Sequence, residues 1–252
     1  MIILEQMDKS ILIEDLSQFN QIALIIEKNF YEEGKFEVLF SYEKRPSIKD
    51  FRTNEKIRNE YFDNIIHILK DEYPFTVSSR YQRILEIKKS PNVVGIINLN
   101  IDGILTLNNP QNVIDLEGNI NWVYCSTCGM DKSMESVVKN QDDITCISCR
   151  SNILKPSMPF KGQDIAQWDL RDSWMLLNKC DNLTILVADQ ISPMTYSFIE
   201  IVRKRNKEIY IVDQSGEKYE NMHSNMINLN FINYSIDNFL HIMIESLNNK
   251  II

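Results

Sequence analysis

The sequence predicts an α/β fold in which a doubly wound parallel sheet carries a smaller module. Short, wholly apolar runs such as 93–97 and 183–188 alternate along the chain with longer amphipathic segments. This alternation is typical of parallel strands that are covered by helices on both faces. Two Cys-x-x-Cys pairs interrupt this alternation of strands and helices. The 252 residues are enough for one large domain with a small insertion.

In chain order, apolar periodicity predicts the elements of this fold. The first is an amphipathic helix over 15–33 that Gly34 ends, followed by a strand over 36–40. Helices follow over 54–71 and 79–89, and then strands over 93–97 and 113–116. After a cysteine-containing module at 122–157 come a helix over 169–180, a strand over 183–188, a helix over 193–206, a strand over 208–213 and a closing helix over 235–249.

Composition excludes several classes of protein. The net charge of −8 disfavours nucleic-acid binding through a basic surface. No run approaches 18 apolar residues, so we expect no membrane span, and the N-terminal residues lack the pattern of a secretory signal. Together with the cysteine usage, this predicts a protein of a reducing, cytoplasmic compartment.

Glycine is scarce. The chain has seven glycines, and neither G-x-G-x-x-G nor the Walker A pattern occurs. Loops that cradle phosphates need clustered glycines, because the backbone amides must approach the phosphate closely. The sequence therefore predicts that an ordinary phosphate-binding loop is missing.

The cysteine pairs are the most specific chemical signal. Cys125 and Cys128 form one pair, Cys146 and Cys149 the other, with 17 residues between Cys128 and Cys146. Four thiolates at this spacing predict a tetrahedral structural Zn²⁺ with no open coordination position. The alternative is two disulfides or four unrelated thiols. Cys180, in an apolar segment, is expected to be a small core residue.

The segments around these pairs follow a recognisable order. Ser47-Ile-Lys-Asp-Phe-Arg52 comes first, then Asn100-Ile-Asp-Gly103 and Ile114-Asp-Leu-Glu-Gly118. Leu154-Lys-Pro-Ser-Met-Pro-Phe-Lys-Gly-Gln163 follows the last cysteine. This order resembles the sirtuins, the Sir2 family of NAD-dependent protein deacylases.

The resemblance implies a Rossmann-like large domain and a small zinc-ribbon and helical domain, with NAD and an acyl-lysine peptide bound between them. The large domain would comprise 1–53, 91–121 and 162–252, and the small one 54–90 and 122–161. The resemblance also implies site residues. Glu117 stands where the family has its catalytic histidine, beside Asn100 and Asp102, and the cofactor-binding positions are Phe51, Arg52, Asn100, Asp102 and Asp213.

The departures from the family fall on this chemistry. Counting back from Asp50 aligns the family's glycine-rich loop with Leu39-Phe-Ser-Tyr-Glu43, where bulky residues and a carboxylate stand. Ala188-Asp-Gln190 replaces a Gly-Thr-Ser loop, Asp213 replaces an asparagine, and Leu99 replaces a glutamine. Pro159 lies in the segment that would pair with the peptide, and it removes one backbone donor there.

These observations support three hypotheses. The first is a sirtuin-fold pseudoenzyme that binds a protein or peptide, in which Asn100 and Asp102 serve the fold. The second is a divergent deacylase, ADP-ribosyltransferase or NAD hydrolase, with Glu117 as general base and Asn100 and Asp102 positioning ribose and water. The third, a zinc-ribbon nucleic-acid binder, conflicts with the charge. The replaced phosphate loops argue against bound NAD or ADP-ribose, so we favour the first.

Overall fold

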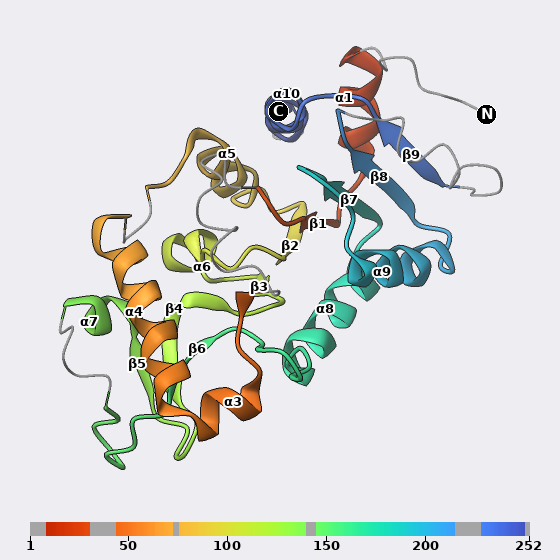
Figure 1. Ribbon diagram of the computed structural model, residues 1–252. Helices are drawn as coiled ribbons and strands as arrows, with labels where there is room; N and C mark the ends of the chain where they lie inside the picture. Colours follow the sequence, from red (N-terminus) through yellow and green to blue (C-terminus); the bar gives the residue numbers. More distant parts are fainter. Residues whose placement is uncertain (1–8, 31–43, 73–75, 140–144, 215–227, 250–252) are drawn as a thin grey trace.

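The computed structural model describes residues 9–30, 44–72, 76–139, 145–214 and 228–249, which form a large sheet and a small one (Figure 1). The large sheet has the order β3-β2-β1-β7-β8-β9, and every neighbouring pair is parallel. Its strands are β1 (Ile22–Ile26), β2 (Val93–Asn98), β3 (Val113–Asp115), β7 (Asn182–Leu186), β8 (Glu208–Val212) and β9 (Leu229–Ile232). This is the doubly wound order of a Rossmann-like fold, so the predicted fold class is confirmed.

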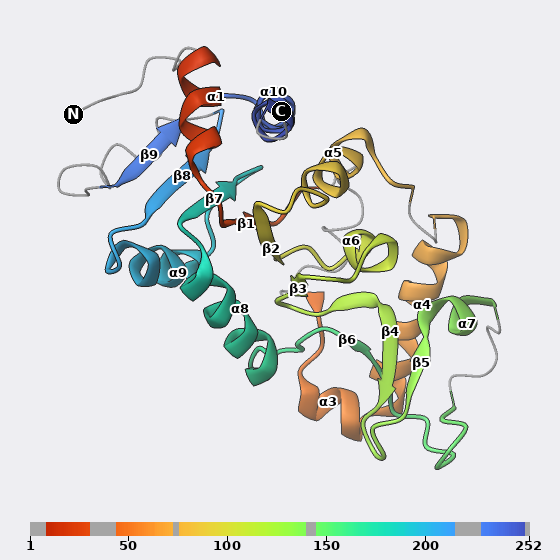
Figure 2. The same cartoon turned by 180° about the vertical axis from the view of Figure 1, so that it is seen from behind.

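Helices cover both faces of this sheet. One side carries α1 (Lys9–Gln18), α5 (Ser79–Ile87) and α10 (Ile236–Asn249), and the other carries α8 (Gln167–Lys179) and α9 (Pro193–Arg203), as Figure 2 shows from behind. Strand β1 contributes alternate residues to the two cores. Ile22, Leu24 and Ile26 pack in the cluster that contains Leu12 of α1, whereas Ala23 and Ile25 pack in the cluster on the opposite face.

The small sheet has the order β5-β4-β6 and is antiparallel. Its elements are β4 (Asn119–Cys125), β5 (Asp131–Ser133), α7 (Met134–Lys139) and β6 (Leu154–Ser157), and α4 (Glu55–Glu72) packs against α7. Two short helices complete the described elements: α3 (Ile48–Thr53) precedes α4, and α6 (Ile104–Asn108) lies between β2 and β3. Among the described residues, no helix is both long and apolar enough to cross a bilayer.

The predicted helix over 15–33 is wrong, and the error matters for the site. Helix α1 ends at Gln18, and Ile22–Ile26 is the strand at the middle of the sheet. The Asp181 carboxylate accepts hydrogen bonds from the backbone amides of Asn20 and Gln21, both at 3.0 Å, where the chain turns between them. A short apolar run does not by itself distinguish helix from strand, and here parallel pairing on both sides decides for the strand.

Most of the other predicted elements are confirmed. The helices at 54–71, 79–89, 169–180, 193–206 and 235–249 and the strands at 93–97, 113–116, 183–188 and 208–213 are confirmed within a few residues. The predicted strand over 36–40 and the predicted loop at Leu39–Glu43 lie outside the described residues. Strand β9 and the short helices α3 and α6 were not predicted.

Candidate functional site

The four cysteines of the two pairs lie together at one end of the small sheet. Their Sγ atoms all lie within 4.8 Å of one another. Cys125 and Cys149 are 3.5 Å apart at sulfur, as are Cys128 and Cys146. A disulfide requires about 2.05 Å, whereas sulfurs about 2.3 Å from one tetrahedral metal are separated by roughly 3.8 Å. All four are free thiols, and their arrangement fits a tetrahedral Zn²⁺.

The two cysteine loops repeat one backbone geometry. In the first, the amide of Cys125 donates to Met130 O and the amide of Gly129 donates to Cys125 O, each at 2.8 Å. In the second, Cys146 and Arg150 make the same two bonds, to Ser151 O and Cys146 O. Gly129 and Arg150 both adopt a left-handed conformation, with φ of 79° and 61°. The spacing within each pair therefore fixes the loop that presents its sulfurs.

Glu117 lies in a tight turn after β3, against β6. Gly118 makes that turn feasible, because its φ is 67° and a Cβ atom there would lie 1.7 Å from Ser157 O. The Gly118 amide donates to Asp115 O at 2.8 Å. The turn thus directs Glu117 toward the region between the two sheets.

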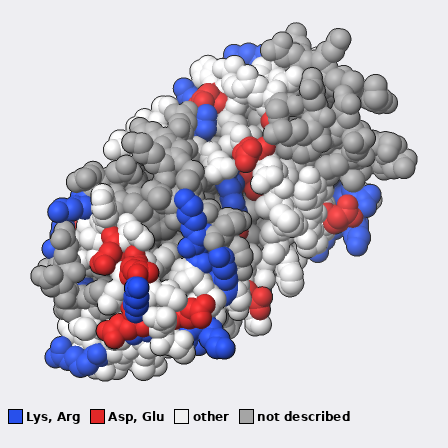
Figure 3. Space-filling model, in the orientation of Figure 1, with Lys and Arg blue, Asp and Glu red and all other residues white. Residues whose placement is uncertain are grey.

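Two cations engage the Glu117 carboxylate. Lys28 Nζ lies 2.6 Å from Oε1, and a guanidinium nitrogen of the buried Arg45 lies 3.8 Å from Oε2. Arg45 also donates to Pro159 O at 2.9 Å. The face of the molecule in Figure 3 carries a band of Lys and Arg across its middle, although the whole chain is acidic. Both carboxylate oxygens of Glu117 thus face positive charges, with Lys28 in direct contact and Arg45 at a longer distance.

Asn100 is buried after β2, and its whole side chain is used inside the protein. Its amide group donates to Glu27 O at 2.9 Å and to Asn98 Oδ1 at 3.0 Å. Its side-chain oxygen accepts from the Phe30 amide at 3.2 Å. These bonds tie the end of β2 to the turn that leaves β1.

Asp102 is also buried and fully bonded. Its two oxygens accept from the Tyr81 hydroxyl at 2.5 Å and from the Ile104 amide at 2.8 Å. Burial raises the pKa of Asp102 to about 6; the hydrogen bonds from Tyr81 and Ile104 oppose the shift, and the charge of Asp115 adds to it. The carboxyl group holds α6 and α5 together.

The turn that leaves β1 begins at Glu27, at the carboxyl edge of the sheet. Glu27 is fully buried, and its Oε1 accepts from the Ser192 amide at 3.0 Å. Ser192 is the N-cap residue of α9, which follows β7. Since strand order reverses between β1 and β7, Glu27 bridges the crevice in which doubly wound folds bind their ligands.

Further carboxylates follow the neighbouring strands. Asp189 lies in the loop between β7 and α9, and its Oδ2 accepts from Asn29 Nδ2 at 3.3 Å. Asp213 directly follows β8, is buried, and donates its amide to Ile232 O at 3.2 Å. The carboxyl ends of three adjacent strands therefore each carry an acidic residue.

Phe51 and Arg52, predicted to contact a cofactor, lie in α3. Phe51 is fully buried in an aromatic cluster, with its ring centroid 4.9 Å from that of Phe160 and 6.1 Å from that of Tyr61. The Arg52 side chain is exposed, and its backbone oxygen accepts from Arg58. Phe51 therefore joins α3 to α4 and to the segment that follows β6.

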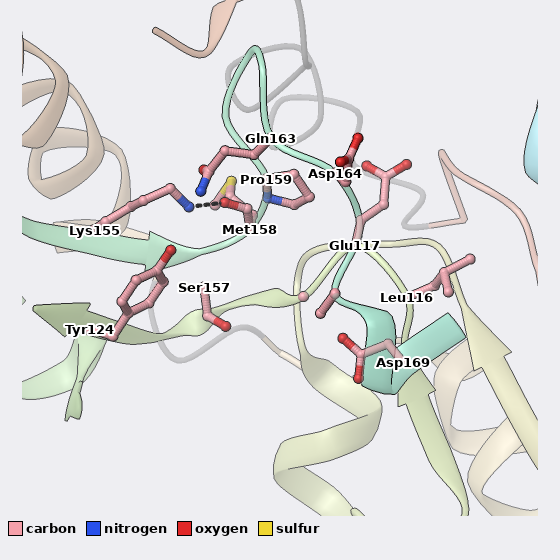
Figure 4. A pocket seen from close by; sticks show the side chains of 12 residues that line it. Leu116, Glu117, Tyr124, Lys155, Ser157, Met158, Pro159, Gln163, Asp164 and Asp169 are labelled. Carbon is pink, nitrogen blue, oxygen red and sulfur yellow. Dashed lines mark hydrogen bonds between the residues drawn. The ribbon is translucent and has the colours of Figure 1, made fainter. Parts of the chain in front are cut away.

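A cavity of about 320 Å³ opens beside Glu117. Figure 4 shows Lys155 and Tyr124 on one side of it and Glu117, Asp164 and Asp169 on the other. Lys155 is buried, donates to Pro156 O and Met158 O, and lies 4.2 Å from the Phe160 ring centroid. Burial lowers the pKa of Lys155 to about 7, with the charges of Arg45 and Arg52 adding to the shift.

Comparison with known proteins decides the family. The family model described as the Sir2 family matches residues 28–190, more than half of the chain. The chain belongs to the Sir2 family. The match begins in the turn after β1 and extends through the cysteine loops to the loop after β7.

Curated relatives in this family are distant. The NAD-dependent protein deacetylase of Thermodesulfovibrio yellowstonii is 25% identical over 150 residues, which cover 58% of each chain. The NAD-dependent protein deacetylase of Thermotoga maritima is 20% identical over 211 residues, covering 75% of this chain and 84% of the relative. The chain thus matches little more than half the length of the first of these proteins.

Solved Sir2 structures share the fold over the whole chain. One, from work on the mechanism and regulation of Sir2 enzymes, has a TM-score of 0.74 at 17% identity and covers 97% of this chain and 98% of its own. Another, a Sir2 with a p53 peptide and NAD⁺, has a TM-score of 0.69 at 16% identity, covering 96% and 100%. At such identity, the likeness concerns the fold alone.

The described lining of this crevice is acidic where a dinucleotide would place its phosphates. A dinucleotide would place two phosphates at the carboxyl edge between β1 and β7, next to Glu27, Asp189 and Asp213. Two like charges a few ångströms apart repel by about 1 kcal/mol even in water, and by more where water is excluded. Glu27 already engages the Ser192 amide, which is the kind of donor that would otherwise bind an anion.

The sequence analysis named Glu117, Asn100 and Asp102 as candidate site residues. It missed the residues that form ion pairs and hydrogen bonds with them. Glu27 and Lys28 fell inside the predicted helix over 15–33, which hid the turn after β1. Arg45 was unremarkable in the sequence, because its partners Glu117 and Pro159 are remote along the chain. Lys155 was noted only as part of a motif, since its burial depends on how the small sheet packs.

Proposed function

We propose that this Sir2-family protein is a pseudoenzyme that binds a protein or peptide and lacks ordinary NAD-dependent deacylation. The observation that carries the proposal is the state of Glu117. This residue stands at the position of the family's catalytic histidine, and Lys28 and Arg45 engage its two oxygens. To act as a base it would have to release these cations and accept a proton in their place.

The polar residues expected to handle ribose and water support the same proposal. The side chain of Asn100 is consumed by bonds to Glu27, Asn98 and Phe30, and that of Asp102 by Tyr81 and Ile104. The bonds of Asn100 join the end of β2 to the turn after β1, and those of Asp102 join α5 to α6. The retention of Asn100 and Asp102 is then accounted for by their role in folding.

We propose that Cys125, Cys128, Cys146 and Cys149 hold a structural Zn²⁺. The metal would cross-link the two cysteine loops, and four thiolates leave no position for a reacting water. Such a site suits the reducing, cytoplasmic compartment predicted from the sequence. The division into a large part (1–53, 91–121, 162–252) and a small part (54–90, 122–161) stays a prediction that limited proteolysis can test.

The cavity beside Glu117 is our proposed place for the partner. Strand addition next to it is restricted, because the chain's own segment 46–48 pairs with Lys161: the Lys161 amide donates to Pro46 O at 3.2 Å, and the Ile48 amide donates to Lys161 O at 3.0 Å. A bound peptide would therefore rely on a side chain that enters the cavity, between Lys155 and the carboxylates of Glu117, Asp164 and Asp169.

The test is release of nicotinamide from NAD, with and without an acetyl-lysine peptide, measured by chromatography on the zinc-loaded protein. We expect no release above the uncatalysed rate, and no heat of binding for NAD or ADP-ribose in calorimetry at millimolar concentration. Glu86→Ala, an exposed change on α5, serves as the control variant.

Activity would establish the second hypothesis instead. Nicotinamide release that disappears in both Asn100→Ala and Glu117→Gln, while Glu86→Ala stays active, would identify a divergent deacylase, ADP-ribosyltransferase or NAD hydrolase. The acceptor found in the product, an acyl group, a protein or water, would then distinguish these three reactions.

A further inference from the structure

The turn after β1 is bonded to several of the described elements that line the crevice. The Glu27 amide donates to Leu186 O of β7 at 3.0 Å, and its carbonyl accepts from Asn100 after β2. Its carboxylate accepts from Ser192, at the start of α9. One residue therefore joins β7, the end of β2 and α9 across the strand-order reversal.

The partner of the carboxylate is a well-formed helix terminus. Helix α9 has 11 residues and begins with Pro193 after the N-cap Ser192, whose hydroxyl accepts from the Thr195 amide at 3.2 Å. The first amides of such a helix, together with its dipole, favour a negative group. In dinucleotide-binding folds, the pyrophosphate lies at the N-terminus of the helix that follows the first strand; α9 instead follows β7, on the other side of the same strand-order reversal.

We propose that the Glu27 carboxylate is a built-in anion that takes the phosphate position of the crevice and closes it to dinucleotides. The inference rests on the proposed function and adds a cause to it: the cofactor is excluded by occupancy of its site. Glu27 is fully buried, and its Oε1 accepts from the Ser192 amide, so this donor is engaged while the side chain stays in place.

The adjacent residue supports closure independently. Asn29 has a φ of 64°, the left-handed conformation that glycine usually provides in phosphate-binding turns. It thus keeps the backbone of a glycine turn while adding a side chain. That side chain donates to Asp189 in the loop after β7, which makes a second link across the crevice.

The carboxylate is not ideally accommodated. Burial raises the pKa of Glu27, and the Thr195 hydroxyl and the Ser192 amide oppose the shift. Within the described residues, Oε2 has no hydrogen-bond partner. A buried carboxylate with one unpaired oxygen costs free energy in this position.

The experiment asks whether removing the carboxylate re-creates an anion site. Inorganic pyrophosphate is titrated into the wild-type protein, Glu27→Ala, Glu27→Gln and the control Glu86→Ala, by calorimetry and thermal unfolding. We expect Glu27→Ala to bind pyrophosphate at least about tenfold more tightly than wild type, and Glu86→Ala to behave as wild type. Glu27→Gln keeps the volume and an acceptor for Ser192, so its affinity should stay at the wild-type level.

Three results would overturn the proposal. Equal pyrophosphate binding by wild type and Glu27→Ala would show that the carboxylate does not occupy the site. A gain in Glu27→Gln as large as in Glu27→Ala would show that charge repulsion, not occupancy, excludes the anion. Wild-type binding of ADP-ribose that weakens in Glu27→Ala would make Glu27 an acceptor for a ribose hydroxyl.

Hydrogen exchange at the Ser192 amide provides a second measurement should Glu27→Ala fail to fold. Glu27→Asp keeps the charge but withdraws it by one methylene, so the Ser192 amide should lose protection. Unchanged protection would refute the proposed contact. These outcomes are separate from nicotinamide release, which tests only whether the protein is an enzyme.

Discussion

The cysteine loops and the crevice after β1 are both built from short turns, yet they differ in how far apart their partners lie. In each cysteine loop, the backbone bonds close within six residues, from Cys125 to Met130 and from Cys146 to Ser151. In the crevice, Glu27 bonds to Ser192, 165 residues away, and Phe30 to Asn100, 70 residues away. Local spacing therefore preserves the cysteine loops. In the crevice, a few substitutions at distant positions can change the hydrogen bonds.

The largest effect that would sharpen this comparison is loss of the proposed metal. Cys125→Ala should abolish stoichiometric zinc and unfold the small sheet, since structural zinc sites contribute on the order of 10 kcal/mol of apparent binding free energy. Zinc content by mass spectrometry and proteolysis of 122–157 measure this. Cys180→Ala, in the core under the large sheet, should keep its zinc. Full zinc content in Cys125→Ala would contradict the assignment.

Next in size is a pair of glycine substitutions, one in the Glu117 turn after β3 and one in the first cysteine loop. Gly118→Ala should lower the free energy of unfolding by about 3 kcal/mol or more, because its Cβ meets Ser157 O at 1.7 Å on top of the left-handed backbone. Gly129→Ala should cost only about 1–2 kcal/mol, since no atom lies within 4 Å of its Cβ. Urea unfolding compares the two, and equal losses would mean that the Glu117 turn is not tightly packed.

Asn100→Ala tests whether the crevice is structural. Removing the side chain leaves Glu27 O and the Phe30 amide without their buried partner, which we expect to cost about 2–4 kcal/mol in urea unfolding. Asn108→Ala, which removes one local bond of an exposed side chain at the end of α6, should change stability by about 0.5 kcal/mol. A stable Asn100→Ala protein would argue for a ligand-binding role instead.

The remaining effect is a pH dependence from Asp102. Its pKa is raised from 3.8 to about 6 in the folded protein, so the protonated form stabilises the fold. This contribution is complete below about pH 3.8 and is lost as the pH rises through about 6, on the order of 3 kcal/mol. Asp102→Asn should lack this pH dependence, because an amide does not titrate. Its hydrogen bond to Tyr81 can be kept, because the Tyr81 hydroxyl can turn to accept from the new amide.

Urea unfolding of both proteins between pH 4 and 7 gives the difference, in which the pH dependence of the shared cysteine site cancels. A constant difference across this range would show that Asp102 does not titrate as its burial predicts.

The sequence by itself determined the fold class and the cysteine site. The short apolar runs at 93–97, 183–188 and 208–213, each next to an amphipathic helical segment, indicated buried parallel strands, and Cys-x-x-Cys spacing fixes a loop without help from the rest of the chain. The motifs at Ser47–Arg52, Asn100–Gly103 and Leu154–Gln163 also sufficed to indicate the family, since each is contiguous.

Only the tertiary structure decided what the crevice contains. Ile22–Ile26 is a strand because β2 and β7 pair with it from both sides, and this places Glu27 at the carboxyl edge instead of inside a helix. The partners of Glu117, Asn100 and Glu27 come from distant segments, which no local pattern reveals. The physical reason is that hydrogen bonds and ion pairs act at a few ångströms, while the sequence separation of these groups is set by the path of the whole chain.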